Sequence, residues 1–245
     1  MAVPLLQAEG LTKRYGGLVA NDAVTLTLLP GEVRGLIGPN GAGKTTFVNL
    51  LTGFEAPDAG RIGLDGRDLT GLPAHQIAAR GLVRTFQVAR VFPNMSVREN
   101  LLLAFLAAGS PGGVQEGQAR ARDLLATGTL EHLADEPAGA LSGGQRMLLQ
   151  ACAGFMIPSV RLYVLDEPFA GINPVVKDTI IALIERENRS NGRAFLIVSH
   201  EMAIVRRLCP RVTVMIQGRV AAEGTLDEVA RRPDVVQAYL GSAAA

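Results

Sequence analysis

A glycine-rich stretch of eight residues carries the clearest chemical signal in the chain. Residues 38–45 read Gly-Pro-Asn-Gly-Ala-Gly-Lys-Thr and match the pattern G-x-x-x-x-G-K-[ST]. Glycines at this spacing let backbone N–H groups turn toward a β-phosphate, and the start of a helix adds partial positive charge. Lys44 can reach the β- and γ-phosphates, and the Thr45 hydroxyl can ligate Mg²⁺. The alternative is a glycine-rich turn without a ligand, but a predicted strand before it and helix after it favour a nucleotide site.

Two adjacent acids end a short apolar run later in the chain. Asp166 and Glu167 follow residues 162–165, which are typical of a central strand buried on both faces. At the carboxyl end of such a strand, Asp166 can hold Mg²⁺ through water, and Glu167 can polarise a water aimed at a γ-phosphate. Taken alone, the pair could equally be a solvated strand end. The phosphate-binding pattern favours the nucleotide site.

A second stretch, Leu141-Ser-Gly-Gly-Gln145, opens a predicted helix. Two glycines and a serine at a helix start form another terminus suited to an anion. One nucleotide does not need two such loops from the same chain. We therefore expect this stretch to hold a nucleotide that is bound by another subunit.

The elements that position these residues alternate between strands and helices. Short apolar runs bounded by glycine and proline predict strands, and residues 88–158 between them predict a helical insert without a convincing strand. Predicted strands cover residues 5–8, 23–29, 33–37, 61–64, 82–86, 162–165, 194–198, 212–216 and 220–223. Predicted helices cover residues 43–52, 74–80, 96–108, 115–127, 143–156, 174–189, 201–208, 226–231 and 234–239.

Composition limits the classes of protein that the chain can be. It has 245 residues, of which 48% are hydrophobic and 19% charged, so it should fold around a proper core. The net charge of +1 gives no global attraction to nucleic acid. Its two cysteines fit neither a disulfide framework nor a zinc site. The apolar runs fall short of the roughly 18–20 residues that span a bilayer, so we expect no transmembrane segment.

Taken together, the motifs resemble the ATP-binding subunit of an ABC transporter over essentially the whole chain. The family's pieces occur in its order: an aromatic at Tyr15, the loop at 38–45, Gln87, the sequence LSGGQ at 141–145, Asp166-Glu167, Ala-Gly-Ile-Asn at 170–173, and Ser199-His200. The resemblance implies an α/β P-loop NTPase fold with a mostly parallel core sheet, N-terminal antiparallel strands and a helical subdomain. It implies one ABC ATPase domain over residues 1–245, with residues 1–87 and 159–245 as the nucleotide-binding core and 88–158 as the helical subdomain.

The same resemblance assigns roles to single residues. Tyr15 would stack on adenine, Glu167 would act as general base, and His200 would contact the γ-phosphate. Gln87 would contact Mg²⁺ or the attacking water, and the metal set would be Thr45, Gln87 and Asp166. The triphosphate would lie on Gly38, Pro39, Asn40, Gly41, Ala42, Gly43, Lys44, Thr45 and Thr46. Contacts to the ATP of a second subunit would come from Ser142, Gly143, Gly144, Gln145 and Asn173. The implied cofactors are ATP and Mg²⁺.

Several stretches are similar to the subfamily that powers the uptake of branched-chain amino acids. They include residues 15–17, 51–54, 83–87, 166–174 and 233–241. Importers of urea and amides and the ATPases of lipopolysaccharide export are related alternatives. Asn173 stands where many ABC ATPases carry Asp, and the insert at 107–130 is short for the branched-chain type.

The resemblance also implies partners and a location. We expect a second ABC ATPase subunit, identical or paralogous, and transmembrane permeases that dock on the helical insert and on residues 88–100. The chain would then be peripheral, on the cytoplasmic face of the inner membrane, with no nucleic acid. A soluble ABC ATPase of DNA repair or translation is the alternative class, but such relatives usually carry a coiled-coil insertion, zinc cysteines or two ATPase units. A metabolite kinase would have no use for LSGGQ.

Overall fold

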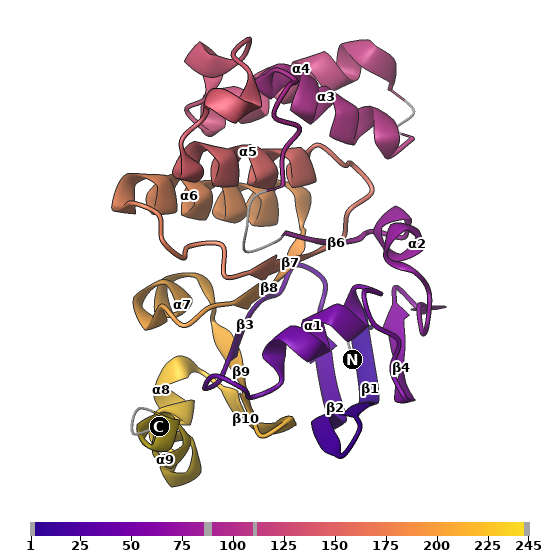
Figure 1. Ribbon diagram of the computed structural model, residues 1–245, viewed down its shortest axis with the longest axis vertical. Coiled ribbons are helices and arrows are strands. Elements are labelled where there is room, and N and C mark those ends of the chain that lie inside the picture. Colours follow the sequence, from indigo (N-terminus) through magenta and orange to yellow (C-terminus); the bar gives the residue numbers. More distant parts are fainter. Residues whose placement is uncertain (1–2, 86–89, 110–111, 243–245) are drawn as a thin grey trace.

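A six-stranded sheet forms the centre of the molecule (Figure 1). The computed structural model describes residues 3–85, 90–109 and 112–242. The sheet has the order β10-β9-β3-β8-β7-β6, and its inner pairs are parallel, with β10 antiparallel to β9. Its strands are β3 (Val33–Ile37), β6 (Leu82–Arg84), β7 (Leu162–Asp166), β8 (Ala194–Val198), β9 (Arg211–Ile216) and β10 (Arg219–Gly224). The predicted parallel core sheet is thus confirmed.

A smaller antiparallel sheet of order β2-β1-β4-β5 covers one side of this core. It consists of β1 (Leu6–Tyr15), β2 (Leu18–Leu28), β4 (Ala59–Leu64) and β5 (Arg67–Asp68). Helix α1 (Lys44–Leu51) packs between the two sheets, because its Phe47 lies in one buried cluster with Leu26 of β2 and Leu36 of β3. This packing fixes the helix that follows the glycine-rich loop.

The first two strands are longer than the apolar runs predict. β1 continues past residue 8 to Tyr15, and β2 begins five residues before the predicted start at residue 23. Gly10 has a φ of +61°, and the pairing of β1 with β2 shifts register after Ala8. Such a bulge carries the chain onward with polar side chains on the solvent side. Hydrophobic alternation alone therefore ends the strand too early.

Helices fill the described part of the chain between β6 and β7 (Figure 1). They are α3 (Val97–Ala107), α4 (Gly113–Thr127) and α5 (Gly143–Phe155), with two short 3₁₀ turns, Glu131–Leu133 and Ala138–Ala140. Ser96 caps α3 in a capping box with Glu99, as the sequence predicts. Helix α6 (Pro174–Asn191) lies directly beneath α5. The remaining helices are α2 (Ala74–Ala79), α7 (Met202–Leu208), α8 (Leu226–Val229) and α9 (Pro233–Ser242).

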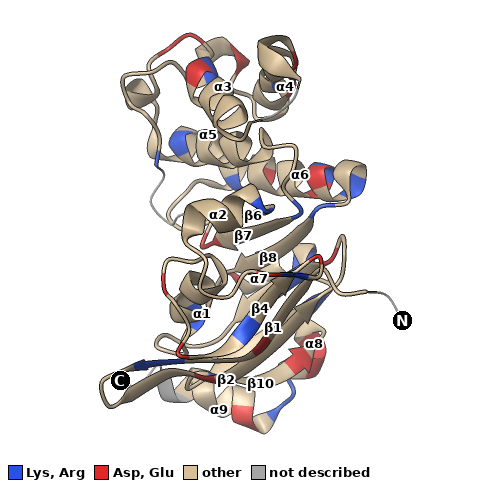
Figure 2. Cartoon of the chain, turned by 90° about the vertical axis from the view of Figure 1, so that its right-hand side faces the viewer, with Lys and Arg blue, Asp and Glu red and all other residues tan. Residues whose placement is uncertain are grey.

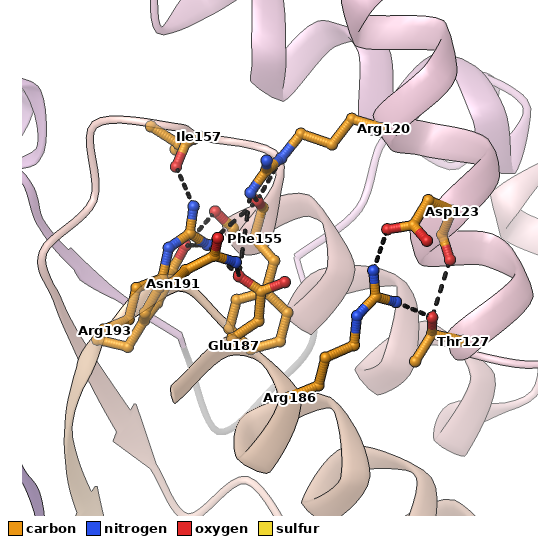
Figure 3. A network of polar contacts seen from close by, with 11 residues as sticks. Arg120, Asp123, Thr127, Phe155, Ile157, Arg186, Glu187, Asn191 and Arg193 are labelled. Carbon is orange, nitrogen blue, oxygen red and sulfur yellow. Dashed lines mark hydrogen bonds and ion pairs between the residues drawn. The ribbon is translucent and has the colours of Figure 1, made fainter. Parts of the chain in front are cut away.

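A polar network fastens this helical layer to the core (Figure 3). Arg193, just before β8, pairs with Glu187 of α6 at 2.6 Å, and both side chains are buried. Arg120 of α4 donates two hydrogen bonds to the carbonyl of Phe155, at 2.9 and 2.6 Å, and Arg193 donates to the carbonyl of Ile157 at 3.2 Å. These carbonyls belong to the end of α5 and the residues after it, where no intrahelical donor is available. Two guanidinium groups thus hold the carboxyl end of α5.

Charged side chains of both signs are spread over the molecule. Figure 2 shows basic and acidic residues on the upper helices as well as on the sheets below. Within the described ranges, no helix is long and apolar enough to cross a membrane.

Candidate nucleotide-binding site

A cavity of about 690 Å³ opens where the two sheets meet α1. This volume falls within the usual range for small-molecule sites. The cavity brings together five segments that the sequence separates by up to 202 residues, from Tyr15 to Gln217. Of the predicted site residues, it is lined by Tyr15, Asn40, Gly41, Ala42, Gly43, Lys44, Thr45, Thr46, Asp166, Glu167 and His200.

The glycine-rich loop joins β3 to α1 and has little space for side chains. Gly38 has a φ of +154° and Gly43 a φ of +93°. A Cβ atom at Gly38 would overlap the carbonyl oxygen of Met215, and one at Gly43 would overlap that of Ala20. Both positions therefore require glycine for steric reasons as well as for backbone conformation. The loop is held in shape by its neighbours on β2 and β9.

Lys44 turns its ammonium group back onto its own loop. Nζ donates to the carbonyls of Gly38 at 2.7 Å and Pro39 at 3.0 Å. Burial lowers the pKa of Lys44, while the carboxylates of Glu167 and Asp166 act in the opposite direction. A partly buried cation that donates only to backbone carbonyls is suited to an anionic ligand, since phosphate oxygens are stronger acceptors than carbonyls.

Both acids lie at the carboxyl end of β7, as predicted. Asp166 ends β7, and Glu167 follows with a φ of +48°, held by a hydrogen bond of 2.9 Å from its N–H to the carbonyl of Val198. His200 follows β8, and its Nδ1 lies 3.0 Å from Oε2 of Glu167. A left-handed conformation is uncommon for glutamate and points to a functional constraint.

The oxygen donors of the cavity fit a magnesium ion that is bound together with phosphates. Thr45 and Asp166 line the same space. Among the described residues, no group of three or more histidine, cysteine, aspartate or glutamate side chains could hold a metal ion by itself. Mg²⁺ typically takes one or two protein oxygens, several waters and substrate phosphates, so this donor set fits it.

Not every predicted residue lies in the cavity. Gln87 lies outside the described residues. Gly38 and Pro39 of the loop are absent from the lining. Residues 142–145 and Asn173 are also absent and lie instead at the starts of α5 and α6. Ser142 forms a capping box with Gln145, and Asn173 caps α6 by accepting from the N–H of Val176 at 2.9 Å. The two helix starts are neighbours, since a Cβ on Gly144 would lie 3.2 Å from Val176.

The structure adds lining residues that the motifs miss. Val19 and Ala20 of β2 line the cavity, and so does Gln217, in the turn between β9 and β10. The adjacent Gly218 donates its N–H to the carbonyl of Ala42 at 3.0 Å, which joins this turn to the loop. The predicted strands 212–216 and 220–223 leave room for a turn between them, but no local pattern indicates which distant loop this turn contacts.

Comparison with known proteins agrees with this geometry. The family described as "ABC transporter" matches residues 21–170. The chain belongs to the ABC transporter family. As a member it is an ATPase. A second family, described as "Branched-chain amino acid ATP-binding cassette transporter", matches residues 219–245 of this ABC protein.

Two similar proteins span the whole ABC chain. It is 40% identical to the high-affinity branched-chain amino acid transport ATP-binding protein BraF of Pseudomonas aeruginosa, with 99% of this chain and 100% of BraF covered. It is 41% identical to LivG of Escherichia coli, which bears the same description, with the same coverage. The lipopolysaccharide export ATP-binding protein LptB of Escherichia coli is 36% identical, with 96% and 97% covered.

Solved structures of ABC cassettes share the fold. The ADP conformation of MJ1267, an ATP-binding cassette of an ABC transporter, matches with a TM-score of 0.85 at 33% identity, covering 98% of this chain and 100% of that one. A nucleotide-free cassette of an ABC transporter matches with a TM-score of 0.82 at 30% identity, covering 96% and 98%. The predicted α/β architecture of this type is confirmed.

Proposed function

We propose that this chain is the ATP-hydrolysing motor subunit of a membrane importer of branched-chain amino acids. One observation carries the proposal. The residues that suit a triphosphate line one cavity, while the LSGGQ stretch lies outside that cavity at an exposed helix start. Each chain therefore carries two different half-sites for ATP. A second chain is needed to complete each of them.

The half-site of the cavity binds the triphosphate and its metal. The backbone of residues 38–46 surrounds the phosphates, and Lys44 exchanges its two carbonyl acceptors for phosphate oxygens. Thr45 and Asp166 hold Mg²⁺, together with Gln87. When bound, Mg²⁺ neutralises charge that develops on the transferring phosphoryl group.

Two residues beside the phosphates act on the attacking water. Glu167 accepts a proton from the water, and the contact with Nδ1 of His200 holds the carboxylate in place. His200 is also well placed to contact a γ-phosphate, because its side chain is 68% exposed at the mouth of the cavity. Tyr15, half exposed at the other end of the lining, offers its ring to adenine.

The other half-site acts on the nucleotide of the second subunit. Ser142, Gly143, Gly144 and Gln145 present the start of α5, and Asn173 presents the start of α6 beside it. Both starts direct backbone N–H groups outward, which favours an anion. The second subunit is another copy of this chain or a paralogue, and ATP between them drives closure.

The helical layer, residues 88–158, transmits closure to the membrane. We infer that transmembrane permeases dock on this layer and on residues 88–100, so that the chain lies peripherally on the cytoplasmic face of the inner membrane. Nucleic acid is not a partner, since both signs of charge are spread over the elements (Figure 2).

Sequence similarity supports branched-chain amino acids as the transported substrate. BraF and LivG, both named for branched-chain amino acid transport, are 40% and 41% identical to this chain, while LptB is 36% identical. The match of residues 219–245 to the branched-chain family points the same way. These likenesses favour branched-chain amino acids over urea, amides or lipopolysaccharide.

Uptake measurements test the substrate and the motor together. In cells that lack this chain, reintroducing it should restore the uptake of radiolabelled leucine, and Lys44→Ala should abolish that gain. Urea uptake in the same cells is the control for the related importer class. Leucine uptake that does not depend on the chain would contradict the substrate, and restored uptake with Lys44→Ala would contradict the motor role.

A further inference from the structure

Arg84 lies against the site, and none of the roles above uses it. It is the last residue of β6, and its Nη2 donates to Oδ2 of Asp166 at 2.7 Å. The two side chains are only 9% and 11% exposed. We propose that Arg84 is a positioning residue that fixes the orientation of the Asp166 carboxylate for Mg²⁺. This inference rests on the proposed function.

The sheet itself brings the two side chains together. β6 and β7 are parallel neighbours, and Arg84 is in register with Val164. Asp166 is two residues further along β7, so it projects from the same face as Val164. An arginine side chain extended along the strand spans that diagonal. The contact therefore follows from register and length, not from a local turn.

A second hydrogen bond fixes the guanidinium from the other side. Nη1 of Arg84 donates to Oδ1 of Asn49 at 2.6 Å. Asn49 belongs to α1, the helix that starts with Lys44 and Thr45. The ring of Phe54 lies against the same group, with its centroid 5.6 Å from Cζ. Arg84 thus joins the phosphate-binding helix to the metal-binding strand.

The contacts continue to the far end of the cavity. Nδ2 of Asn49 donates to Oε1 of Glu55 at 2.7 Å, and the hydroxyl of Tyr15 donates to Oε2 of Glu55. An unbroken series of polar contacts therefore runs from Asp166 through Arg84, Asn49 and Glu55 to Tyr15. The orientation of Arg84 is set by this series as well as by Asp166.

Two effects of Arg84 on the metal have opposite signs. Its positive charge repels a cation, whereas its hydrogen bond to Asp166 orients the carboxylate that would bind the cation. Loss of a partner that orients a metal ligand typically weakens metal binding by about 10- to 100-fold. We expect orientation to dominate, because a guanidinium that already shares its charge with Asp166 adds little net repulsion. Lysine keeps the charge but lacks the fork that reaches Asn49 and Asp166 together.

The test measures metal binding directly, without turnover. Mn²⁺, which takes the same oxygen ligands as Mg²⁺, is titrated by electron paramagnetic resonance into the full chain with a non-hydrolysable ATP analogue. Arg84→Met and Arg84→Lys should both bind Mn²⁺ about tenfold more weakly. Their affinity for the analogue in EDTA should equal that of the wild type. Arg161→Met is the matched control, since it removes the same charge from an exposed ion pair with Asp65 and should change neither value.

Three results would overturn the inference: unchanged Mn²⁺ affinity in Arg84→Met, tighter Mn²⁺ binding in that variant, or full recovery in Arg84→Lys. If Arg84→Met does not fold, Asn49→Ala removes the other anchor of the guanidinium and should weaken Mn²⁺ binding in the same direction. A wild-type chain that binds no nucleotide would contradict the proposed function instead. The two failures are therefore distinguishable.

Discussion

At the scale of single residues, Glu167 has an unfavourable backbone conformation at the position where the proposed function places the general base. Its φ of +48° costs of order 1–3 kcal/mol in a residue other than glycine. The hydrogen bond to the carbonyl of Val198 and the contact with His200 hold it there. A strained carboxylate beside a phosphate-binding loop is expected where position matters more than stability.

Replacing this carboxylate by its amide should separate binding from hydrolysis. Glu167→Gln keeps the size of the side chain but cannot accept the proton of water. Hydrolysis should slow by about 10²- to 10⁴-fold, with nucleotide affinity close to that of the wild type. Phosphate release in a single turnover and a fluorescent nucleotide titration measure the two quantities. Near-normal turnover in the purified variant would refute the role of Glu167 as base.

The residues of the site differ in how far the sequence could predict them. The loop at 38–45 is predictable, since its glycines, lysine and threonine form a local pattern that is suited to phosphate binding. Arg84 and Gln217 are not. The contact of Arg84 with Asp166 depends on strand order, and the position of Gln217 in the cavity lining depends on a distant hairpin. The spacing of residues along the chain does not predict such long-range contacts.

At the scale of secondary-structure elements, α3 and α5 offer a matched pair of helix starts. Ser96 caps α3 and Ser142 caps α5, each in a capping box. Ser96→Ala and Ser142→Ala should each lower the free energy of unfolding by about 1 kcal/mol. Only Ser142→Ala should also lower ATPase activity, because in the proposed dimer only that hydroxyl would face a second subunit's nucleotide. Urea denaturation and steady-state hydrolysis measure both effects. Equal activity in the two variants would argue against a role of α5 in the site.

The network that holds the end of α5 should matter for stability. Arg193→Met removes the shorter ion pair of the buried Glu187 and leaves it with Arg120 at 3.9 Å and a hydrogen bond from Asn191, so it should cost about 3 kcal/mol, the low end for a broken buried pair. Arg186→Ala breaks an ion pair with Asp123 whose side chains are 34% and 55% exposed, and it should cost no more than about 1 kcal/mol. Urea denaturation compares the two variants. A similar small cost in both would show that the buried pair does not stabilise the junction of α4, α6 and β8.

Element boundaries follow from how local their signals are. β3 and β8 have the predicted bounds, 33–37 and 194–198, because both are short and buried throughout or nearly so. The ribbon of β1 and β2 exceeds its prediction, because its outer half is polar and depends on cross-strand pairing. Composition cannot reveal pairing of that kind.

At the scale of the whole molecule, the reactivity of the two cysteines measures whether the core is folded. Burial raises the pKa of both Cys152 and Cys209 to about 12. The native chain should therefore leave Ellman's reagent unreacted at pH 8, and both thiols should react after denaturation. An unfolded thiol ionises near pH 8.5, so these groups stabilise the fold below that pH, and stability should fall as the pH rises toward 12. Rapid labelling of the native chain would contradict this burial.

In the proposed dimer, each ATP site is shared between two chains. The cavity lacks the LSGGQ stretch of its own chain, and that stretch stands exposed beside Asn173. Both native cysteines are buried, so they should not react with a cross-linker aimed at cysteines introduced across such a shared site.

Cysteine cross-linking between the two half-sites shows whether the ATP site is shared. One chain carries Asn40→Cys. A differently tagged second chain, either another copy or a paralogue, carries cysteine in place of the serine of its LSGGQ stretch, which is Ser142→Cys in the copy. Both are in the slow-hydrolysis background of Glu167→Gln. A bismaleimide should join the two tags in one band that requires ATP, and chains with either cysteine alone should give none. Absence of that band while ATP is bound, or a link formed within a single chain that carries both cysteines, would contradict the account.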